Sequence, residues 1–141
     1  MEQTNIQLNL EDLLNNLKKS DTKLDCLKLA YNIISKRYHG QRLYTVTHLF
    51  NIFNNNIEHL LQSSGTMHCT NINHLLRFLL ISSGIFSKED IKTRWTLLWF
   101  ISPHQYLEVK TEDGLVKVDI WARNFGIEFG DYAHGWHLKT E

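Results

Sequence analysis

The stretch GTMHCTNINHLLRFLLISSG, from Gly65 to Gly84, carries the apolar pattern that predicts the central element of the fold. After Cys69, apolar residues recur at the spacing i, i+3, i+4 and i+7, which is typical of a helix with a buried face. These residues are Ile72, Leu75, Leu76 and Leu79. Further apolar residues at 78, 80 and 81 widen the face, so we expect a largely buried, central helix that ends at Gly84.

Cys69 lies where this predicted helix begins. The unpaired N–H groups and the dipole of a helix N-terminus favour an anion such as a thiolate, and reactive cysteines recur in this setting. The alternative is a structural role, because free cysteines are commonly buried as small apolar residues. Cys26, the other cysteine, lies between Leu24 and Leu27 inside another predicted helix, and we interpret it as a packing residue.

The composition favours one soluble domain. A chain of 141 residues can bury about two-thirds of its unfolded surface without disulfides. Lys+Arg and Asp+Glu both number 15, and no long run of one sign is present, so we expect no nucleic-acid partner. Two cysteines make no disulfide framework and fit a reducing compartment. No signal peptide is visible and the apolar stretch 75–86 is too short to span a bilayer, so we expect a cytoplasmic protein without a membrane partner.

The first 63 residues are predicted to be helical. Acidic residues follow a candidate cap and lysines close the first segment, as helix ends favour. Three helical segments are expected: one capped by Asn9, one that begins at Asp21 or Thr22 and ends near Gly40, and one over 46–62 that the asparagines at 54–56 can divide.

The pattern changes to strands after Gly84. SKED at 87–90 resembles a capping box that opens a short helical turn. TRWTLLWFI at 93–101 predicts a buried strand, and HQYLEVK and LVKVDIW predict two alternating strands joined around TEDG. Helices followed by strands predict an α+β fold, in which a helical N-terminal half and the central cysteine-bearing helix pack on an antiparallel sheet.

Two polar residues of the last strands fall on one face of the predicted sheet. His104 begins one strand and Asp119 lies on the next, and counting with a period of two places both on the same side. Alone, His104 is typical of a strand edge and Asp119 of a surface acid or half of a salt bridge. With Cys69, however, they supply a nucleophile, a base and a group that orients the base.

The pairing register decides whether His104 and Asp119 meet. A tight turn centred on residues 113–114 places Asp119 opposite Glu108, about 13 Å along the strand from His104. A turn centred on residues 111–112 places Asp119 opposite His104 instead. We predict the second register, because only that one of the two allows a hydrogen bond between the side chains.

Three stretches resemble the core of the transglutaminase-like superfamily. They are HCTNINHLLRFLLISSGI, HQYLEV and VKVDIW, and the resemblance covers about residues 65–121. That core carries a cysteine at a helix start, a histidine in a strand and an aspartate in the following strand. The resemblance implies a papain-like triad of Cys69, His104 and Asp119. In it, Cys69 attacks an amide or ester carbonyl, His104 transfers the proton, and Asp119 orients His104.

The resemblance implies a thiol-dependent peptidase, amidase or amine acyltransferase that forms a thioester intermediate. We expect a peptide or protein side-chain amide as substrate, while the acceptor, water or an amine, stays open. The backbone N–H of Cys69 is the expected oxyanion donor. Candidates for a second donor or a substrate contact are His68, Thr66, Gln62 and Trp121.

One transglutaminase-like domain is expected over residues 1–141, with a helical section at 1–63, a catalytic core at 64–121 and a C-terminal segment at 122–141. We interpret this C-terminal segment as a cover over the sheet, with a substrate-binding lip as the alternative. No acidic loop cluster suited to calcium is visible, and we expect no cofactor.

Two other functions are compatible with the residues. One is a binding module on the same fold that has lost its chemistry. The other is a zinc site built from His68, Cys69 and His74, or from His134 and His137, although no CxxC or HExxH spacing is present. The sequence leaves the oligomeric state open.

Overall fold

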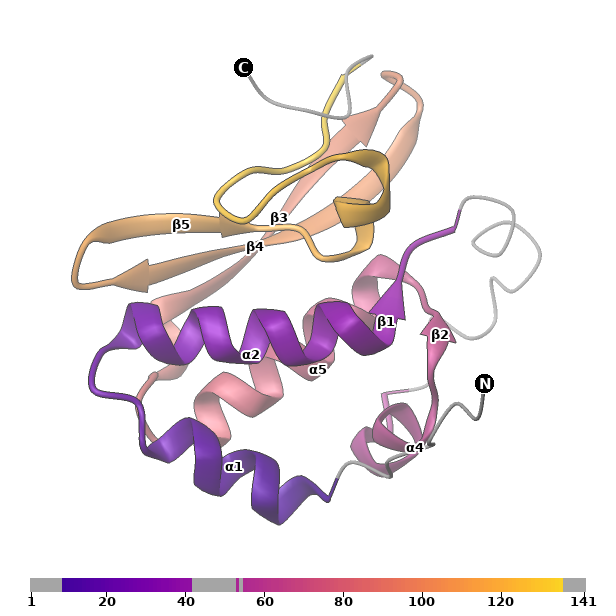
Figure 1. Ribbon diagram of the computed structural model, residues 1–141. Helices are drawn as coiled ribbons and strands as arrows, with labels where there is room; N and C mark the ends of the chain where they lie inside the picture. Colours follow the sequence, from indigo (N-terminus) through magenta and orange to yellow (C-terminus); the bar gives the residue numbers. More distant parts are fainter. Residues whose placement is uncertain (1–8, 42–52, 54, 136–141) are drawn as a thin grey trace.

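The computed structural model describes residues 9–41, 53 and 55–135, and it combines helices with β-strands (Figure 1). Most of residues 46–54, the first part of the predicted helical segment 46–62, lies outside the described residues. The elements, in chain order, are α1 (Leu10–Lys18), α2 (Lys23–Arg37), β1 (Tyr38–His39), α4 (Ile57–Gln62), β2 (Gly65–Thr66), α5 (Cys69–Ser82), the 3-10 turn η2 (Lys88–Asp90), β3 (Ile91–Leu98), β4 (Ser102–Thr111), β5 (Gly114–Val118) and the 3-10 turn η3 (Trp121–Phe125).

The helix starts are set by local capping. The Asn9 side chain accepts a hydrogen bond from the Glu11 N–H at the start of α1, and Thr22 does the same for Asp25 at the start of α2. Asn56 caps α4 in the same way, so the asparagine run does mark a helix start. Each cap satisfies an N–H that the first turn leaves unpaired. The caps predicted at Asn9 and Thr22 are therefore confirmed.

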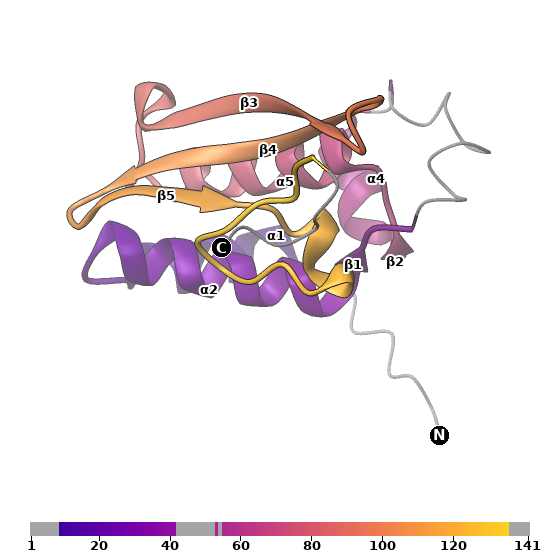
Figure 2. The ribbon, with the colours of Figure 1, turned by 90° about the horizontal axis from the view of Figure 1, so that it is seen from above.

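α5 is the central helix, as its apolar pattern predicts. It lies with α2 between α1 and the sheet, and it runs behind β4 when seen from above (Figures 1 and 2). Its fully buried side chains are Ile72, Leu75, Leu76, Leu79 and Leu80. Burying each such side chain contributes on the order of 2 kcal/mol, so α5 anchors the core and holds its N-terminus in a fixed place.

Strands β3, β4 and β5 form an antiparallel sheet in that order. The prediction of a buried strand at 93–101 is wrong, because β3 is an edge strand whose residues 92–95 are exposed, and it ends at Leu98. α5 packs mainly against β4, which leaves most of β3 uncovered. A second, two-stranded parallel sheet of β1 and β2 was not predicted.

The β4–β5 register differs from both predicted registers. Thr111 pairs with Gly114, so Glu112 and Asp113 are the two central residues of the turn. The Thr111 hydroxyl donates to the Gly114 carbonyl at 3.0 Å and accepts from the Asp113 N–H at 3.3 Å, which closes the turn at this position. Gly114 has a φ of 117°, which glycine adopts without steric strain.

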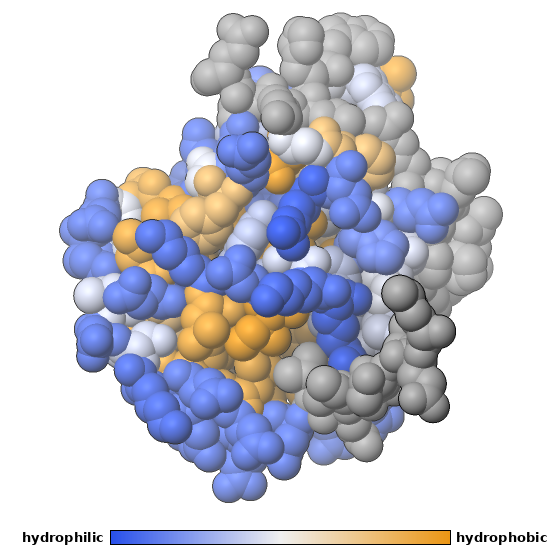
Figure 3. Space-filling view, in the orientation of Figure 1, coloured by the Kyte–Doolittle hydropathy of each residue, from blue (hydrophilic) through white to orange (hydrophobic). Residues whose placement is uncertain are grey.

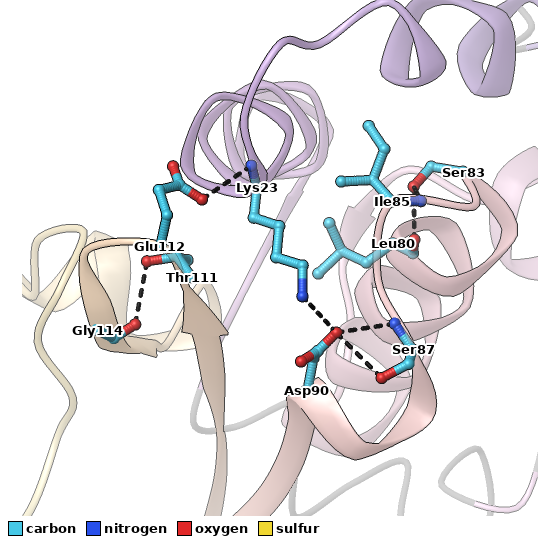
Figure 4. Close-up of polar contacts among 9 residues, drawn as sticks. All are labelled: Lys23, Leu80, Ser83, Ile85, Ser87, Asp90, Thr111, Glu112 and Gly114. Carbon is cyan, nitrogen blue, oxygen red and sulfur yellow. Dashed lines mark hydrogen bonds and ion pairs between the residues drawn. The ribbon is translucent and has the colours of Figure 1, made fainter.

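Long-range contacts hold this turn against the start of α2 (Figure 4). The Glu112 carboxylate accepts from the backbone N–H groups of Lys23 and Leu24, both at 3.1 Å. The Lys23 ammonium donates to Asp90 at 2.7 Å, and this bond helps to lower the pKa of Asp90 to about 2. Asp90 also closes the predicted capping box with Ser87, which confirms that prediction. The sheet, η2 and α2 are thus joined at the end away from Cys69.

The C-terminal segment crosses one face of the sheet from β5 to β3. The Gly130 N–H donates to the Lys117 carbonyl at 3.1 Å, and the Tyr132 ring stacks on Tyr106 with ring centres 4.2 Å apart. Further along, Gly135 forms backbone hydrogen bonds with Leu97 and Trp99. Residues 130–135 therefore lie over all three strands.

Polar residues cover much of the face seen in Figure 3, and apolar residues gather between α1 and α2 and also above α2, over the sheet. Leu10, Leu14 and Ile33 are among the side chains that pack on the core while staying partly exposed. Within the described part of the chain, no helix is long and apolar enough to cross a bilayer.

Candidate active site

The segment before Cys69 is fixed by the small parallel sheet. Tyr38 pairs with Gly65 and His39 with Thr66, and the Met67 N–H donates to the His39 carbonyl at 3.1 Å. The chain then enters α5, with His68 as the N-cap residue and Cys69 as the first helical residue. Cys69 is partly exposed, so a reactant can reach a thiol that sits where the helix N-terminus favours negative charge.

Cys26 lies in a different environment. Its side chain is fully buried in α2, where its sulfur contacts the Ser83 hydroxyl at 3.8 Å. Burial raises the pKa of the Cys26 thiol. The interpretation of Cys26 as a packing residue agrees with this placement.

His104 and Asp119 are in direct contact. The Nε2 atom of His104 lies 2.7 Å from the Oδ2 atom of Asp119, and the side chains are only 2% and 1% exposed. The Cys69 side chain is the other neighbour of the imidazole, close enough to raise the pKa of His104. Because Asp119 occupies Nε2, the nitrogen that remains for Cys69 is Nδ1. The three predicted residues are thus brought together in the order Cys69, His104, Asp119.

This environment changes the proton affinity of His104. Burial lowers the pKa of the imidazole, but the hydrogen bond with Asp119, the negative charge of that carboxylate and the neighbouring Cys69 side chain together outweigh burial. The net effect raises the pKa of His104 from 6.5 to about 9. The direction of this pKa shift favours the imidazolium form of His104 beside the Asp119 carboxylate.

Asp119 reaches His104 in a way that the sequence did not predict. It follows the last residue of β5, Val118, instead of lying within the strand. Continuing the observed register places Asp119 opposite Tyr106, two residues from His104, and such diagonal neighbours are within side-chain reach. The predicted pairing of Asp119 directly opposite His104 is wrong, yet the shared face holds because the register differs by an even number of residues.

Two backbone groups fix the Asp119 carboxylate, and sequence reasoning missed both. The Ala122 N–H of η3 donates to Oδ1 at 3.2 Å, and the Ala133 N–H of the C-terminal segment donates to Oδ2 at 2.9 Å. Neither alanine carries a functional side chain, so no residue pattern could reveal them. The crossing C-terminal segment consequently takes part in positioning the carboxylate.

Trp121 packs against the triad instead of facing solvent. Its ring centre lies 5.0 Å from that of His104, and the side chain is buried. Gly40 donates its N–H to the Trp121 carbonyl at 3.2 Å, and a Cβ atom on Gly40 would overlap the Trp121 ring and carbonyl. The sequence suggested only that Gly40 ends a helix, whereas the structure shows that a side chain has no room there.

Replacing Gly40 with alanine is expected to destabilise the protein by about 1–3 kcal/mol, the usual effect of overpacking. The displaced Trp121 ring would also loosen the wall beside His104. Urea unfolding of the Gly40→Ala variant measures the effect. Gly130→Ala is the control, because a Cβ there meets open space and only the cost of its positive φ applies. An unchanged free energy of unfolding in Gly40→Ala would contradict the close contact.

The three candidates for a second oxyanion donor lie in different settings. His68 is buried at the N-cap position of α5. The Thr66 hydroxyl lies 3.3 Å from the Gln41 side-chain oxygen and 3.4 Å from His39 Nε2. Gln62 is exposed at the end of α4. These placements identify no second donor, and the Cys69 N–H at the helix start remains the best-placed group.

No group of three or more His, Cys, Asp or Glu side chains suited to a metal ion is found among residues 9–41, 53 and 55–135. His137, one of the candidate zinc ligands, lies outside the described residues. Comparisons of the chain with family models, with curated proteins and with solved structures give no match.

Proposed function

We propose that the protein is a thiol-dependent acyl-transfer enzyme with Cys69 as nucleophile, His104 as acid–base group and Asp119 as the residue that orients His104. The observation that carries this proposal is the buried hydrogen bond between His104 and Asp119, with Cys69 beside the imidazole at the N-terminus of α5. A nucleophile, a base within reach and a third group behind the base are the recurring parts of such sites.

The reaction follows from these positions. The Cys69 thiolate attacks the carbonyl carbon, and the carbonyl oxygen takes the negative charge beside the helix N-terminus, where the Cys69 N–H can donate to it. His104, protonated through Nδ1, gives its proton to the leaving amine or alcohol as the carbon–heteroatom bond breaks. A thioester on Cys69 results. His104 then removes a proton from the acceptor, which attacks the thioester and releases the acyl group together with the regenerated thiol.

The resemblance of residues 65–121 to the transglutaminase-like core supports the same chemistry, and we propose that the fold is of that kind. A peptide bond or a protein side-chain amide is the proposed substrate. Water as acceptor gives a peptidase or amidase, and an amine gives a transferase. A thiol nucleophile also suits the reducing compartment that the cysteine content indicates.

Mixing the protein with p-nitrophenyl acetate is expected to release a burst of p-nitrophenol equal to the amount of protein, followed by slower turnover. The reason is that Cys69 forms the thioester faster than water removes it. Stopped-flow absorbance measures the burst in the wild type, in Cys69→Ala and in Cys26→Ala.

Cys26→Ala is the matched control, because it removes the other thiol and leaves the triad intact. The burst should disappear in Cys69→Ala and persist in Cys26→Ala. No burst in the wild type, or the same burst in Cys69→Ala, would contradict the proposal. An unreactive Cys69 in a folded protein would instead favour a binding module on the same fold.

A further inference from the structure

A second polar site lies along α5, beyond the triad. A cavity of about 220 Å³ lies between this helix and the sheet. Its lining includes Thr70, Asn73, His74 and Arg77 from successive turns of α5, with Thr93 of β3 and Gln105 of β4 facing them. The four helical residues follow the spacing of one helix face, so the cavity runs along the helix axis away from Cys69.

Arg77 is the cationic side chain of this cavity, and no carboxylate among the described residues faces it there. None of the described residues that line it carries a carboxylate. The Nε atom of Arg77 is buried and has no hydrogen-bond partner within the described part of the chain, and the same holds for the Thr70 hydroxyl. A partly buried guanidinium normally has a carboxylate or another acceptor beside it, because an unpaired charge loses solvation without compensation. Arg77 is therefore placed to bind an anion that the described residues do not supply.

The neighbouring side chains add donors. Asn73 donates to the backbone carbonyl of Gln105 at 2.9 Å and to its side-chain oxygen at 3.3 Å. Because the side-chain oxygen of Gln105 accepts from Asn73, the NH₂ group of Gln105 is the part of its amide that can donate to a ligand. His74, three residues before Arg77 on α5, supplies a ring N–H in either tautomer. A carboxylate in the cavity would thus meet several donors and one permanent positive charge.

An exposed aromatic side chain borders the site. Trp95 of β3 pairs directly with Gln105, two residues from Thr93, and it is 60% exposed. Leu97, on the same face of β3, is 48% exposed. Aromatic side chains and arginine are both enriched at protein interfaces, so this apolar edge beside Arg77 suits the binding of a peptide.

The position of the cavity relates it to the nucleophile. Thr70 follows Cys69 directly, and His74 and Arg77 lie about 8 and 12 Å further along the helix axis. An extended peptide covers these distances in about two to four residues. Building on the proposed function, we propose that this cavity is a specificity site for an acyl-donor peptide carrying a carboxylate two to four residues before the reacting carbonyl.

Binding of acidic peptides to the Cys69→Ala protein tests this proposal without depending on catalysis. The probes are N-terminally fluorescein-labelled alanine hexapeptide amides with one Glu two, three or four residues before the C-terminal amide, each matched by a peptide with Gln in its place. Fluorescence anisotropy should give a dissociation constant about 10- to 100-fold lower for the best Glu peptide than for its Gln counterpart, the effect of a charge-assisted pair.

The Arg77→Gln variant should remove this preference. Arg94→Gln is the matched control, because Arg94 is already paired with Glu108 at 2.9 Å and does not line the cavity. Arg77→Lys keeps the charge without the planar fork and should retain only part of the preference. Circular dichroism shows whether Arg77→Gln folds. If it does not, the peptide preference of Arg77→Lys is the test instead.

Equal binding of Glu and Gln peptides, or a preference that Arg77→Gln or Arg77→Lys leaves unchanged, would overturn the specificity site. Release of ammonia from the same peptides by the wild type is measured separately. Binding without ammonia release, combined with absence of the nitrophenol burst, would instead count against the proposed catalysis and leave the anion site standing.

Discussion

Replacing His104 with alanine is expected to slow acylation of Cys69 by p-nitrophenyl acetate by about 10²–10⁴-fold at neutral pH, the usual contribution of a positioned acid–base group. The imidazole lies beside the Cys69 side chain, which raises the pKa of the ring, so the substitution removes the base next to the thiol. The rate constant of the nitrophenol burst measures the loss.

His104→Gln separates catalysis from folding. Removing the buried ring altogether leaves the Asp119 carboxylate with one partner fewer, which itself can destabilise the protein. A glutamine amide can still donate to Asp119, but it cannot carry the proton between thiol and leaving group. We therefore expect a folded His104→Gln protein with a rate close to that of His104→Ala.

His59→Gln serves as the control, because His59 is an exposed residue of α4. It should retain the wild-type burst. Near-full activity in His104→Gln would remove His104 from the mechanism. A folded wild type that loses its structure in both His104 variants would support a structural role for this residue instead.

Replacing Asp119 with alanine is expected to destabilise the protein by about 3–5 kcal/mol, the typical result of removing one partner from a buried ion pair. The carboxylate accepts from His104, Ala122 and Ala133, so its loss leaves three buried donors without an acceptor. It also releases the C-terminal segment from the site. Urea unfolding measures this loss, and Asp113→Ala, in the exposed turn, is the control.

Asp119→Asn is expected to have a smaller effect on stability and a direct effect on His104. The amide oxygen can keep two of the three hydrogen bonds, but the negative charge is lost. Burial still lowers the pKa of His104, but the neutral amide no longer raises it with a negative charge. The pKa of His104 should therefore fall well below its wild-type value of about 9. NMR titration of the imidazole C–H signal, assigned by comparison with His104→Gln, measures this change.

The direction of the pH effect on stability follows from the same pKa. Because folding raises the pKa of His104 from 6.5 to about 9, the pair with Asp119 stabilises the folded state fully below pH 6.5. That contribution decreases as the pH rises through about 9, and Asp119→Asn should abolish most of the decrease. An unchanged His104 titration in Asp119→Asn would contradict the hydrogen-bonded pair.

The local features of the fold were readable from the sequence because short-range physics sets them. The caps at Asn9 and Thr22 and the Ser87–Asp90 box satisfy backbone groups only a few residues away. The bounds of α5 follow from its apolar period and from the glycine after it. Cys69 at the start of this helix was therefore predictable.

The features that depend on distant contacts were not readable. The turn at Glu112 and Asp113 is held by the start of α2, almost ninety residues earlier in the chain. The exposure of β3 depends on where α5 packs. β-branched and aromatic residues are common in both edge strands and buried strands, so the composition of β3 could not show which kind it is.

The site itself was predicted in part. Because side chains alternate between the two faces of a strand, counting residues in steps of two was enough to place His104 and Asp119 on one face. A register shift of two residues does not change that result. A single sequence could not predict the backbone donors at Ala122 and Ala133 or the close approach of Gly40 to Trp121, because no residue pattern is required for them. They decide how firmly the carboxylate and the imidazole are held.

The most direct test of the account is to locate the acyl group after reaction with an electrophilic acyl probe. Intact-mass and peptide mapping should find one acyl group per chain, on Cys69, in the wild type and in Cys26→Ala. Labelling should be lost in Cys69→Ala and strongly slowed in His104→Gln. An acyl group on Cys26 or on lysines, with Cys69 unmodified, would contradict the assignment of Cys69 as the nucleophile.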